Sequence, residues 1–137
     1  MSELGDRMEA IRAALAAMFP ARVVTRKAVD PANQPREDMV KGIYTLIALG
    51  EEGFTNVAGY EAEDARQQIL IVGDFVLDEG QGGDAIENAE FAMRDEIKAF
   101  CKALPDSLCT LNLIAWAGST QAAAPFGGAI FQLEYIP

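Results

Sequence analysis

The sequence predicts an α+β fold: a mainly antiparallel sheet of four to five strands with two amphipathic helices packed on one face. Two long segments carry apolar residues at helical spacing, and at least four shorter segments have the apolar or alternating pattern of strands. They follow the order helix, two or three strands, helix, two strands, which is typical of α+β domains. A chain of 137 residues is near the commonest domain size, so we expect a single domain over 1–137.

The first helix is expected close to the start of the chain. Its apolar positions follow steps of four and three residues and are Leu4, Met8, Ile11, Leu15 and Met18. The Ser2 side chain can accept a hydrogen bond from an amide of the first turn. The helix should end at Phe19-Pro20, because proline cannot continue the hydrogen-bond ladder.

A second amphipathic helix is expected between Asp84 and Pro105. Asp84 and Glu87 have the spacing of a capping box at its start. Glu90 interrupts an otherwise apolar stripe in helical phase, which consists of Ile86, Met93, Ile97, Phe100, Cys101 and Leu104. Pro105 then acts as the stop signal.

Strands are expected in five segments, which are 22–26, 42–49, 67–77, 108–116 and 129–136. The charged ends of the first suit a sheet edge, and the second is apolar throughout, as in an interior strand covered on both faces. The third has one wholly apolar face and one mixed face, whereas 54–66 has no clear pattern. Because two helices cover only one face of such a sheet, we expect a partner subunit to cover apolar residues on the other.

Two further segments, about 28–41 and 117–128, are expected to be mobile loops. The first contains Pro31 and Pro35, which cannot take part in regular strand pairing. The second is small, uncharged and rich in glycine, which suits either a segment that orders against another protein or an ordinary surface loop. Both interpretations stay open from the sequence alone.

The composition argues against several classes of function. Eleven Lys and Arg against 21 Asp and Glu give a net charge of −10, which opposes binding to a phosphate backbone. The chain has no histidine, so the commonest general base and the Ser-His-Asp arrangement are missing. Ser107, Ser119 and Thr120 have no base beside them in the sequence. We therefore expect no enzyme activity, no catalytic residues and no cofactor.

Three acidic clusters are interpreted either as solvated surface or as a weak Mg²⁺ or Ca²⁺ site: Glu51-Glu52, Glu61 with Glu63 and Asp64, and Asp74 with Asp78 and Glu79. None has calcium-loop spacing, so we expect no metal site. The glycine turn over 80–83 lacks the Lys and Ser or Thr of a phosphate-binding loop.

Cys101 and Cys109 are expected to be buried thiols rather than a disulfide. The longest apolar runs are too short to span a membrane, so we expect a cytoplasmic protein without membrane contact.

The order of several short features resembles that of one protein family. They are the helix ending at Phe19-Pro20, Arg26, the strand between Gly42 and Gly50-Glu51, the acidic connection with Tyr60, the second helix, and the Ser119-x-Gln121-x-x-x-Pro125 pattern before the Tyr135 strand. Together they resemble the phage tail-terminator family, the minor tail protein U-like group of long-tailed phages and prophages. A head-to-tail connector subunit of similar size is an alternative with the same pattern.

The resemblance implies a structural virion assembly protein without catalytic activity. Subunits would form a hexameric ring on the finished tail tube, stop polymerisation of the tail-tube protein and present a surface to the head-completion protein. DNA would pass through the lumen without specific binding, and the protein would occur in the host cytoplasm during assembly and then in the virion tail. The expected interface residues are Arg36, Glu37 and Asp38 in the first loop and Ser119, Gln121, Pro125 and Phe126 in the second.

Two other functions stay open: a small-ligand or peptide-binding α+β module that uses the sheet face and the second loop, and a metal-assisted hydrolase that uses the acidic clusters. For a ring, the net charge opposes self-association, so we expect free subunits to be monomeric or weakly associated at low salt. Salt, divalent cations or the tube end would promote the ring, because screening shortens the repulsion to about 10 Å at 0.1 M.

Overall fold

The computed structural model describes residues 2–28, 30–52, 66–78, 82–105, 108 and 110–136. Within them the elements are α1 (Glu3–Met18), β1 (Val23–Thr25), a 3-10 turn η1 (Pro31–Asn33), α2 (Arg36–Lys41), β2 (Ile43–Glu52), β3 (Arg66–Val76), α3 (Gly83–Lys102), β4 (Leu111–Gly118) and β5 (Phe126–Tyr135). The predicted α+β fold is confirmed.

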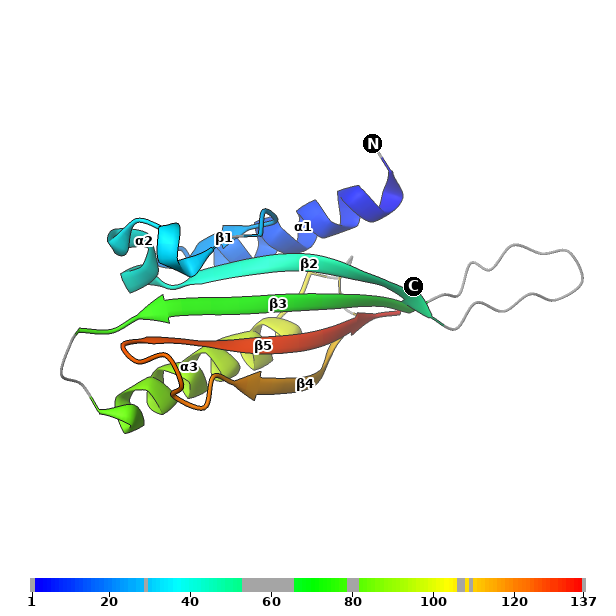
Figure 1. The fold of residues 1–137 in the computed structure, drawn as a ribbon. Helices are drawn as coiled ribbons and strands as arrows, with labels where there is room; N and C mark the ends of the chain where they lie inside the picture. Colours follow the sequence, from blue (N-terminus) through cyan, green and yellow to red (C-terminus); the bar gives the residue numbers. More distant parts are fainter. Residues whose placement is uncertain are drawn as a thin grey trace, which may run out of the picture.

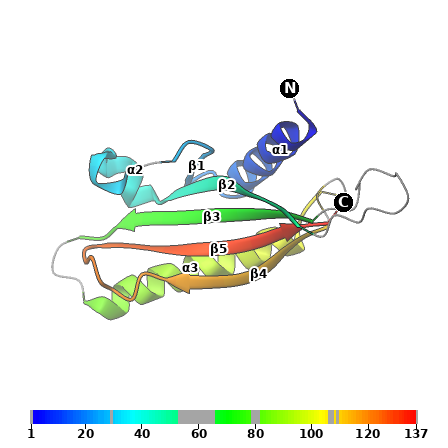
Figure 2. The ribbon, with the colours of Figure 1, turned by 45° about the vertical axis from the view of Figure 1, so that its right-hand side comes forward.

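The strands form one mixed sheet in the order β1-β2-β3-β5-β4. Strands β1 and β2 are parallel, and the other neighbouring pairs are antiparallel. Figures 1 and 2 show α1 behind β1 and β2 and α3 behind β5 and β4, so both long helices cover the same face of the sheet. As predicted, the short strand β1 lies at an edge. We call the face opposite to α1 and α3 the open face.

Helix α1 has the boundaries that its local sequence predicts. The Ser2 side chain accepts a hydrogen bond from the Gly5 amide at 3.0 Å, and the helix ends just before Phe19. The middle of the predicted apolar stripe is buried in the core, whereas Leu4 and Met18 at its ends are each 38% exposed. The stripe therefore identified the buried side of the helix correctly.

Helix α3 starts differently from the prediction. The expected capping box of Asp84 and Glu87 is wrong, because Gly82 is the N-cap and has no side chain that could accept a hydrogen bond. The helix thus begins at Gly83 and places Asp84 inside its first turn. There the carboxylate still interacts favourably with the positive end of the helix dipole. Glu90, which interrupts the apolar stripe, is buried together with that stripe.

The main core lies between the sheet and the two long helices. Its members include Met8, Ile11, Leu15, Tyr44, Leu46, Ile69, Ile71, Phe75, Ile86, Met93, Ile97, Phe100, Leu108, Leu111, Phe131 and Leu133. In β3, fully buried residues alternate with half-buried ones, as predicted. Strand β2 is buried on both faces only as far as Leu46, and Leu49 is 55% exposed. The prediction of full coverage is wrong for its second half, because no described element covers the open face there.

The segment 28–41 is not the loop that its prolines predict, since it contains η1 and α2. Pro35 is the N-cap of α2, a position that needs no amide hydrogen. Met39 packs against Ile43 and Val76 and is only 1% exposed. Burial of such a side chain contributes about 1.5–3 kcal/mol. This contact holds α2 on one corner of the open face.

The loop predicted over 117–128 is shorter than expected. Strand β4 continues to Gly118 and β5 starts at Phe126, so the connection between them is 119–125. Gly118 pairs with Ala129 across the two strands, and Gly128 pairs with Asp74 of β3. Much of the glycine-rich segment therefore belongs to the sheet.

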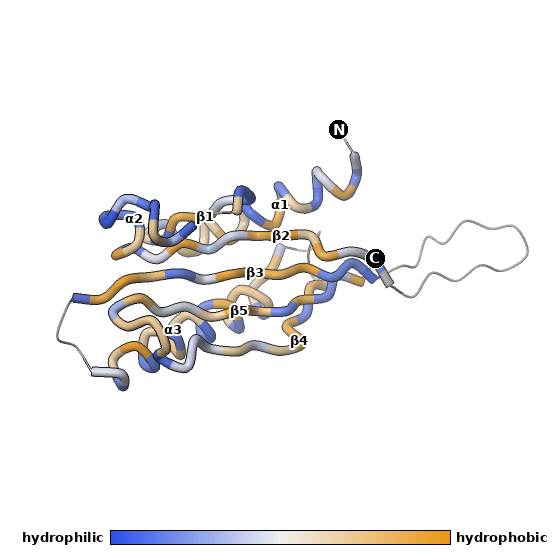
Figure 3. The backbone as a smooth tube through the Cα atoms, in the orientation of Figure 1, coloured by the Kyte–Doolittle hydropathy of each residue, from blue (hydrophilic) through white to orange (hydrophobic). Residues whose placement is uncertain are grey.

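The hydropathy of the chain follows this layered arrangement. Figure 3 shows hydrophobic residues through the middle of β2 and β3, whereas hydrophilic residues gather at the right-hand ends of β3 and β5. Among the helices that the structure describes, none is both long and apolar enough to cross a membrane.

Candidate functional site

The described part of the chain covers only one corner of the open face, the corner occupied by α2. Beyond it, strand register places Ile47, Leu70, Val72 and Ile130 on the same face. Ile130 is 48% exposed, and the other three are half-buried. The open face therefore presents a continuous set of apolar side chains from three neighbouring strands.

A hollow of about 450 Å³ lies on this face above β3 and β5. Its floor comes from Val72 to Asp74 and from Gly127 to Ile130. One side is formed by residues 30–32, which are the N-cap and first two residues of η1, and the other by the connection after β4, which includes Ser119 and Ala123. The two segments that the sequence singles out, 28–41 and 117–128, thus meet at one place in the fold.

Gly128 forms part of the floor of the hollow. It lies directly opposite Asp74 in the register of β3 and β5. A Cβ atom at this position would collide with the Gly73 carbonyl oxygen and would come within 3.3 Å of the Asp74 carboxylate. The close approach of the two strands therefore requires glycine here.

Asp74 is the charged residue on the floor. Burial raises the pKa of its carboxyl above the ordinary value, and among the residues that the structure describes neither a charge nor a hydrogen bond adds to the shift. No residue in the described ranges forms a hydrogen bond or ion pair with this carboxylate. Such a group is partly desolvated without compensation, and a cationic partner would relieve this cost.

The second carboxylate at the hollow, Asp30, is already engaged. It accepts hydrogen bonds from the Ala32 amide at 3.0 Å and from the Asn33 side-chain amide at 2.9 Å. Among the described residues that line the hollow there is no lysine or arginine. The lining is mostly apolar, and because its two charged residues, Asp30 and Asp74, are acidic, it favours a cation over an anion.

Glu90 of α3 holds the connection 119–125 from the helix-covered side of the sheet. Its carboxylate, in a residue only 3% exposed, accepts hydrogen bonds from the Ser119 amide at 3.2 Å, the Ser119 hydroxyl and the Gly128 amide at 3.1 Å. Strand β4 ends at Gly118, so the Gly128 amide has no β4 residue opposite it and donates to the Glu90 carboxylate instead. The Ser119 hydroxyl also accepts a hydrogen bond from the Gln121 amide at 3.3 Å.

Of the predicted interface residues in 117–128, Ser119 and Phe126 line the hollow. Gln121 lies outside its lining, with its side chain next to Gly83 at the start of α3. The Pro125 carbonyl oxygen accepts a hydrogen bond from the Leu77 amide at 2.9 Å. The structure therefore brings only part of this set together at the hollow.

The predicted interface residues of α2 lie beside the hollow rather than in it. Arg36 and Glu37 are exposed and Asp38 is half-buried. The Arg36 guanidinium is 3.5 Å from the Asp78 carboxylate, and both side chains are largely exposed. Asp30 and its neighbours in η1, from the same predicted loop, line the hollow instead.

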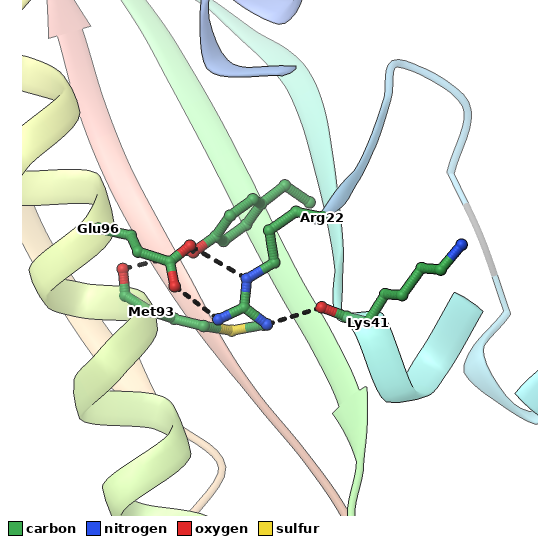
Figure 4. A network of polar contacts seen from close by, with 5 residues as sticks. Arg22, Lys41, Met93 and Glu96 are labelled. Carbon is green, nitrogen blue, oxygen red and sulfur yellow. Dashed lines mark hydrogen bonds and ion pairs between the residues drawn. The ribbon is translucent and has the colours of Figure 1, made fainter. Parts of the chain in front are cut away.

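A second polar cluster, shown in Figure 4, lies between β2, α2 and α3. The Arg22 guanidinium donates to both Glu96 oxygens, at 3.0 and 2.6 Å, and to the Lys41 carbonyl at 2.8 Å. The Tyr44 hydroxyl donates to Glu96 at 3.0 Å, and burial, followed by the Glu96 charge, raises the pKa of Tyr44. The hydrogen bond to Glu96 raises the pKa of Arg22.

Every charged group in this cluster has a partner, so the arrangement fastens elements together rather than exposing a reactive group. Gly42 contributes through its backbone, because it adopts a φ of 87° and the Arg22 guanidinium occupies the space that a Cβ atom would need. The cluster is therefore a structural tie between the start of β2 and α3.

The remaining candidates add no further site within the described residues. There, no group of three or more His, Cys, Asp and Glu side chains could hold a metal ion. Cys101 has a free thiol, and burial raises its pKa to about 11. Several residues singled out by the sequence lie outside the described ranges: Tyr60, Glu61, Glu63, Asp64, Glu79, Gly80, Gln81, Ser107 and Cys109.

The sequence does not identify Glu90 as part of the site. The only hint in the sequence is that Glu90 interrupts the apolar stripe of α3, because a carboxylate on a buried helix face must find hydrogen-bond donors. The donors Ser119 and Gly128 follow 29 and 38 residues later in the chain. Helical periodicity could therefore mark Glu90 as unusual, but could not name its partners.

Comparison of the sequence with protein-family models gives no match, and comparison with curated proteins gives none.

Proposed function

We propose that the protein is a structural assembly subunit of long-tailed phages or prophages, a tail terminator that caps the tail tube and stops its polymerisation. The observation that carries the proposal is the open face, where Ile47, Leu70, Val72 and Ile130 lie together and Ile130 is 48% exposed. A contiguous, partly exposed apolar surface of this kind is typical of protein contacts. The resemblance in element order supports the specific role.

Charge supports the same proposal. A ring of subunits that each carry a charge of −10 has an acidic surface, and such a lumen would let DNA pass without adhering to it. The proposed partners are further copies of the chain in a hexameric ring, the tail-tube protein and the head-completion protein. The proposed location is the host cytoplasm during assembly and the virion tail afterwards.

Light scattering over a salt series, combined with electron microscopy, tests the proposal. We expect monomers or weak association at low ionic strength and rings as salt rises, because screening weakens the repulsion between acidic subunits. Ile130→Asp adds a charge to the open face and should prevent binding to the ends of tail tubes. Leu4→Asp, which adds the same charge on α1, is the matched control and should still bind them.

Two results would contradict the proposal in different ways. A protein that stays monomeric at all salt concentrations and does not bind the ends of tail tubes is not a terminator. A tight hexamer at very low ionic strength, without divalent cations, would refute the charge argument while leaving the ring in place.

The hollow favours a second candidate function, a small-ligand or peptide-binding module. Its volume of about 450 Å³ falls in the range of ligand sites, about 300–1,000 Å³. A metabolite that raises the melting temperature without changing the oligomeric state would support this function over the first.

A further inference from the structure

We propose that the hollow is a docking site for an arginine side chain, presented by an apolar segment of a partner polypeptide, whose guanidinium pairs with Asp74. This inference rests on the proposed role in assembly through protein contacts. It adds the chemistry by which one partner is recognised.

The hollow is complementary to a side chain with an apolar stem and a cationic end. Val72, Phe126 and Ile130 line the hollow together with small residues such as Ala117. The methylene groups of an arginine can pack on such a surface while its head group stays polar. The Asp74 carboxylate has both oxygens free of partners among the described residues, which suits the two parallel hydrogen bonds that a guanidinium can donate.

The apolar surface around the hollow is larger than one side chain or small molecule can cover. The apolar surface does not end at the hollow, because Leu70 and Ile47 continue it across β3 and β2. A small amine would fill the hollow and leave these side chains in water. A polypeptide segment can place one arginine in the hollow and cover the neighbouring strands with its flanking residues.

Another protein is favoured over a second copy of the chain as the source of the arginine. Each arginine already forms an ion pair with a carboxylate of its own chain, and these are Arg7, Arg12, Arg22, Arg26, Arg36, Arg66 and Arg94. The chain as a whole carries a charge of −10, which opposes docking of a second copy on an acidic hollow. A different, less acidic protein therefore fits better.

The test is calorimetric titration of the full chain with the blocked peptide Ac-Ala-Leu-Arg-Leu-Ala-NH2. We expect saturable binding that weakens about tenfold or more when arginine is replaced by citrulline, which keeps the shape and removes the charge. Asp74→Asn should cause a similar loss. Asp95→Asn removes the same charge from the exposed surface of α3 and should change the affinity by less than about twofold.

Three further arms separate the alternatives. Ala117→Leu fills the hollow without touching Asp74 and should also weaken binding. Free n-butylguanidinium should bind about tenfold more weakly than the peptide, and equal affinity would overturn the polypeptide as the source. The peptide with lysine in place of arginine should bind more weakly, because an ammonium cannot form the paired contact.

Absence of saturable binding, or binding that is unchanged in Asp74→Asn, would overturn the proposal. The failure of this inference is distinguishable from failure of the proposed function, because light scattering measures ring formation separately. Rings without peptide binding would leave the terminator proposal standing and remove the arginine site. Peptide binding that depends on Asp74, in a protein that never forms rings, would support the arginine site and count against the terminator proposal.

Discussion

Replacement of Glu90 tests whether its buried carboxylate holds the connection 119–125 in place. We compare Glu90→Met, which keeps most of the side-chain volume but accepts no strong hydrogen bond, with Glu90→Gln, which keeps one acceptor oxygen. The comparison separates hydrogen bonding from packing, because both variants fill the space that the glutamate occupies.

The expected loss follows from the three hydrogen bonds that Glu90 accepts, two from Ser119 and one from the Gly128 amide. Hydrogen bonds to a charged group contribute about 1.5–3 kcal/mol each, and a buried donor left unpaired costs about 1–3 kcal/mol. The bonds share one oxygen and are not additive, and removal of a buried charge offsets part of the loss. We therefore expect Glu90→Met to lower the free energy of unfolding by about 3 kcal/mol and Glu90→Gln by about 1 kcal/mol.

Urea denaturation measures these differences, and amide hydrogen exchange locates them. The Gly128 amide should lose protection in Glu90→Met, because its hydrogen-bond acceptor is gone. Asp95→Ala, on the exposed side of the same helix, should change stability by no more than about 0.5 kcal/mol. The reasoning is refuted if Glu90→Met is as stable as the wild type, or if protection of the Gly128 amide is unchanged.

Two other stability predictions follow from the titratable groups. Because the pKa of Asp74 is raised in the folded protein, the folded state binds this proton more tightly than the unfolded chain does. Protonation of Asp74 therefore adds to the free energy of unfolding in full below the unfolded pKa, about 3.9. This contribution is lost as the pH rises through the folded pKa. Asp74→Asn should therefore stabilise the protein at pH 7 more than at pH 4 in urea titrations. Arg22→Leu should cost about 3 kcal/mol in the same assay, because it leaves Glu96 and Tyr44 partly buried without their cation; Arg22→Lys should recover only part.

Signals within a few residues of each other were sufficient for the elements that the sequence predicts well. The cap at Ser2 and the proline after Phe19 bound α1, and alternation along β3 separates its buried face from the face that carries Asp74. The prediction fails for α2, because its burial depends on Met39 meeting Val76, a residue on another strand. Prolines marked the segment correctly as unsuited to a strand, but could not show that a helix would pack there.

The hollow could not be predicted for the same physical reason. The sequence pointed to both of its sides, but as separate loops, and it favoured Arg36 to Asp38 where the structure places Asp30 to Ala32 at the hollow. Which residues of a segment meet a distant strand depends on register and on helix packing, and neither is encoded in a local pattern. Asp74 was visible as a charge on a mixed strand face, but only the fold shows that no described residue pairs with it.

The position of Glu90 bears on how the hollow would bind a partner. Its carboxylate reaches the end of β4 from the helix layer, so the connection 119–125 is fastened to a helix that itself packs on the core. Such a wall is already ordered before anything binds, and a preformed site avoids the entropy cost of ordering a loop on association. The Asp74 carboxylate and this wall are separate features, because none of the hydrogen bonds that hold the wall involves Asp74. A partner that uses the hollow therefore gains from a site that the fold builds whether or not the partner is present.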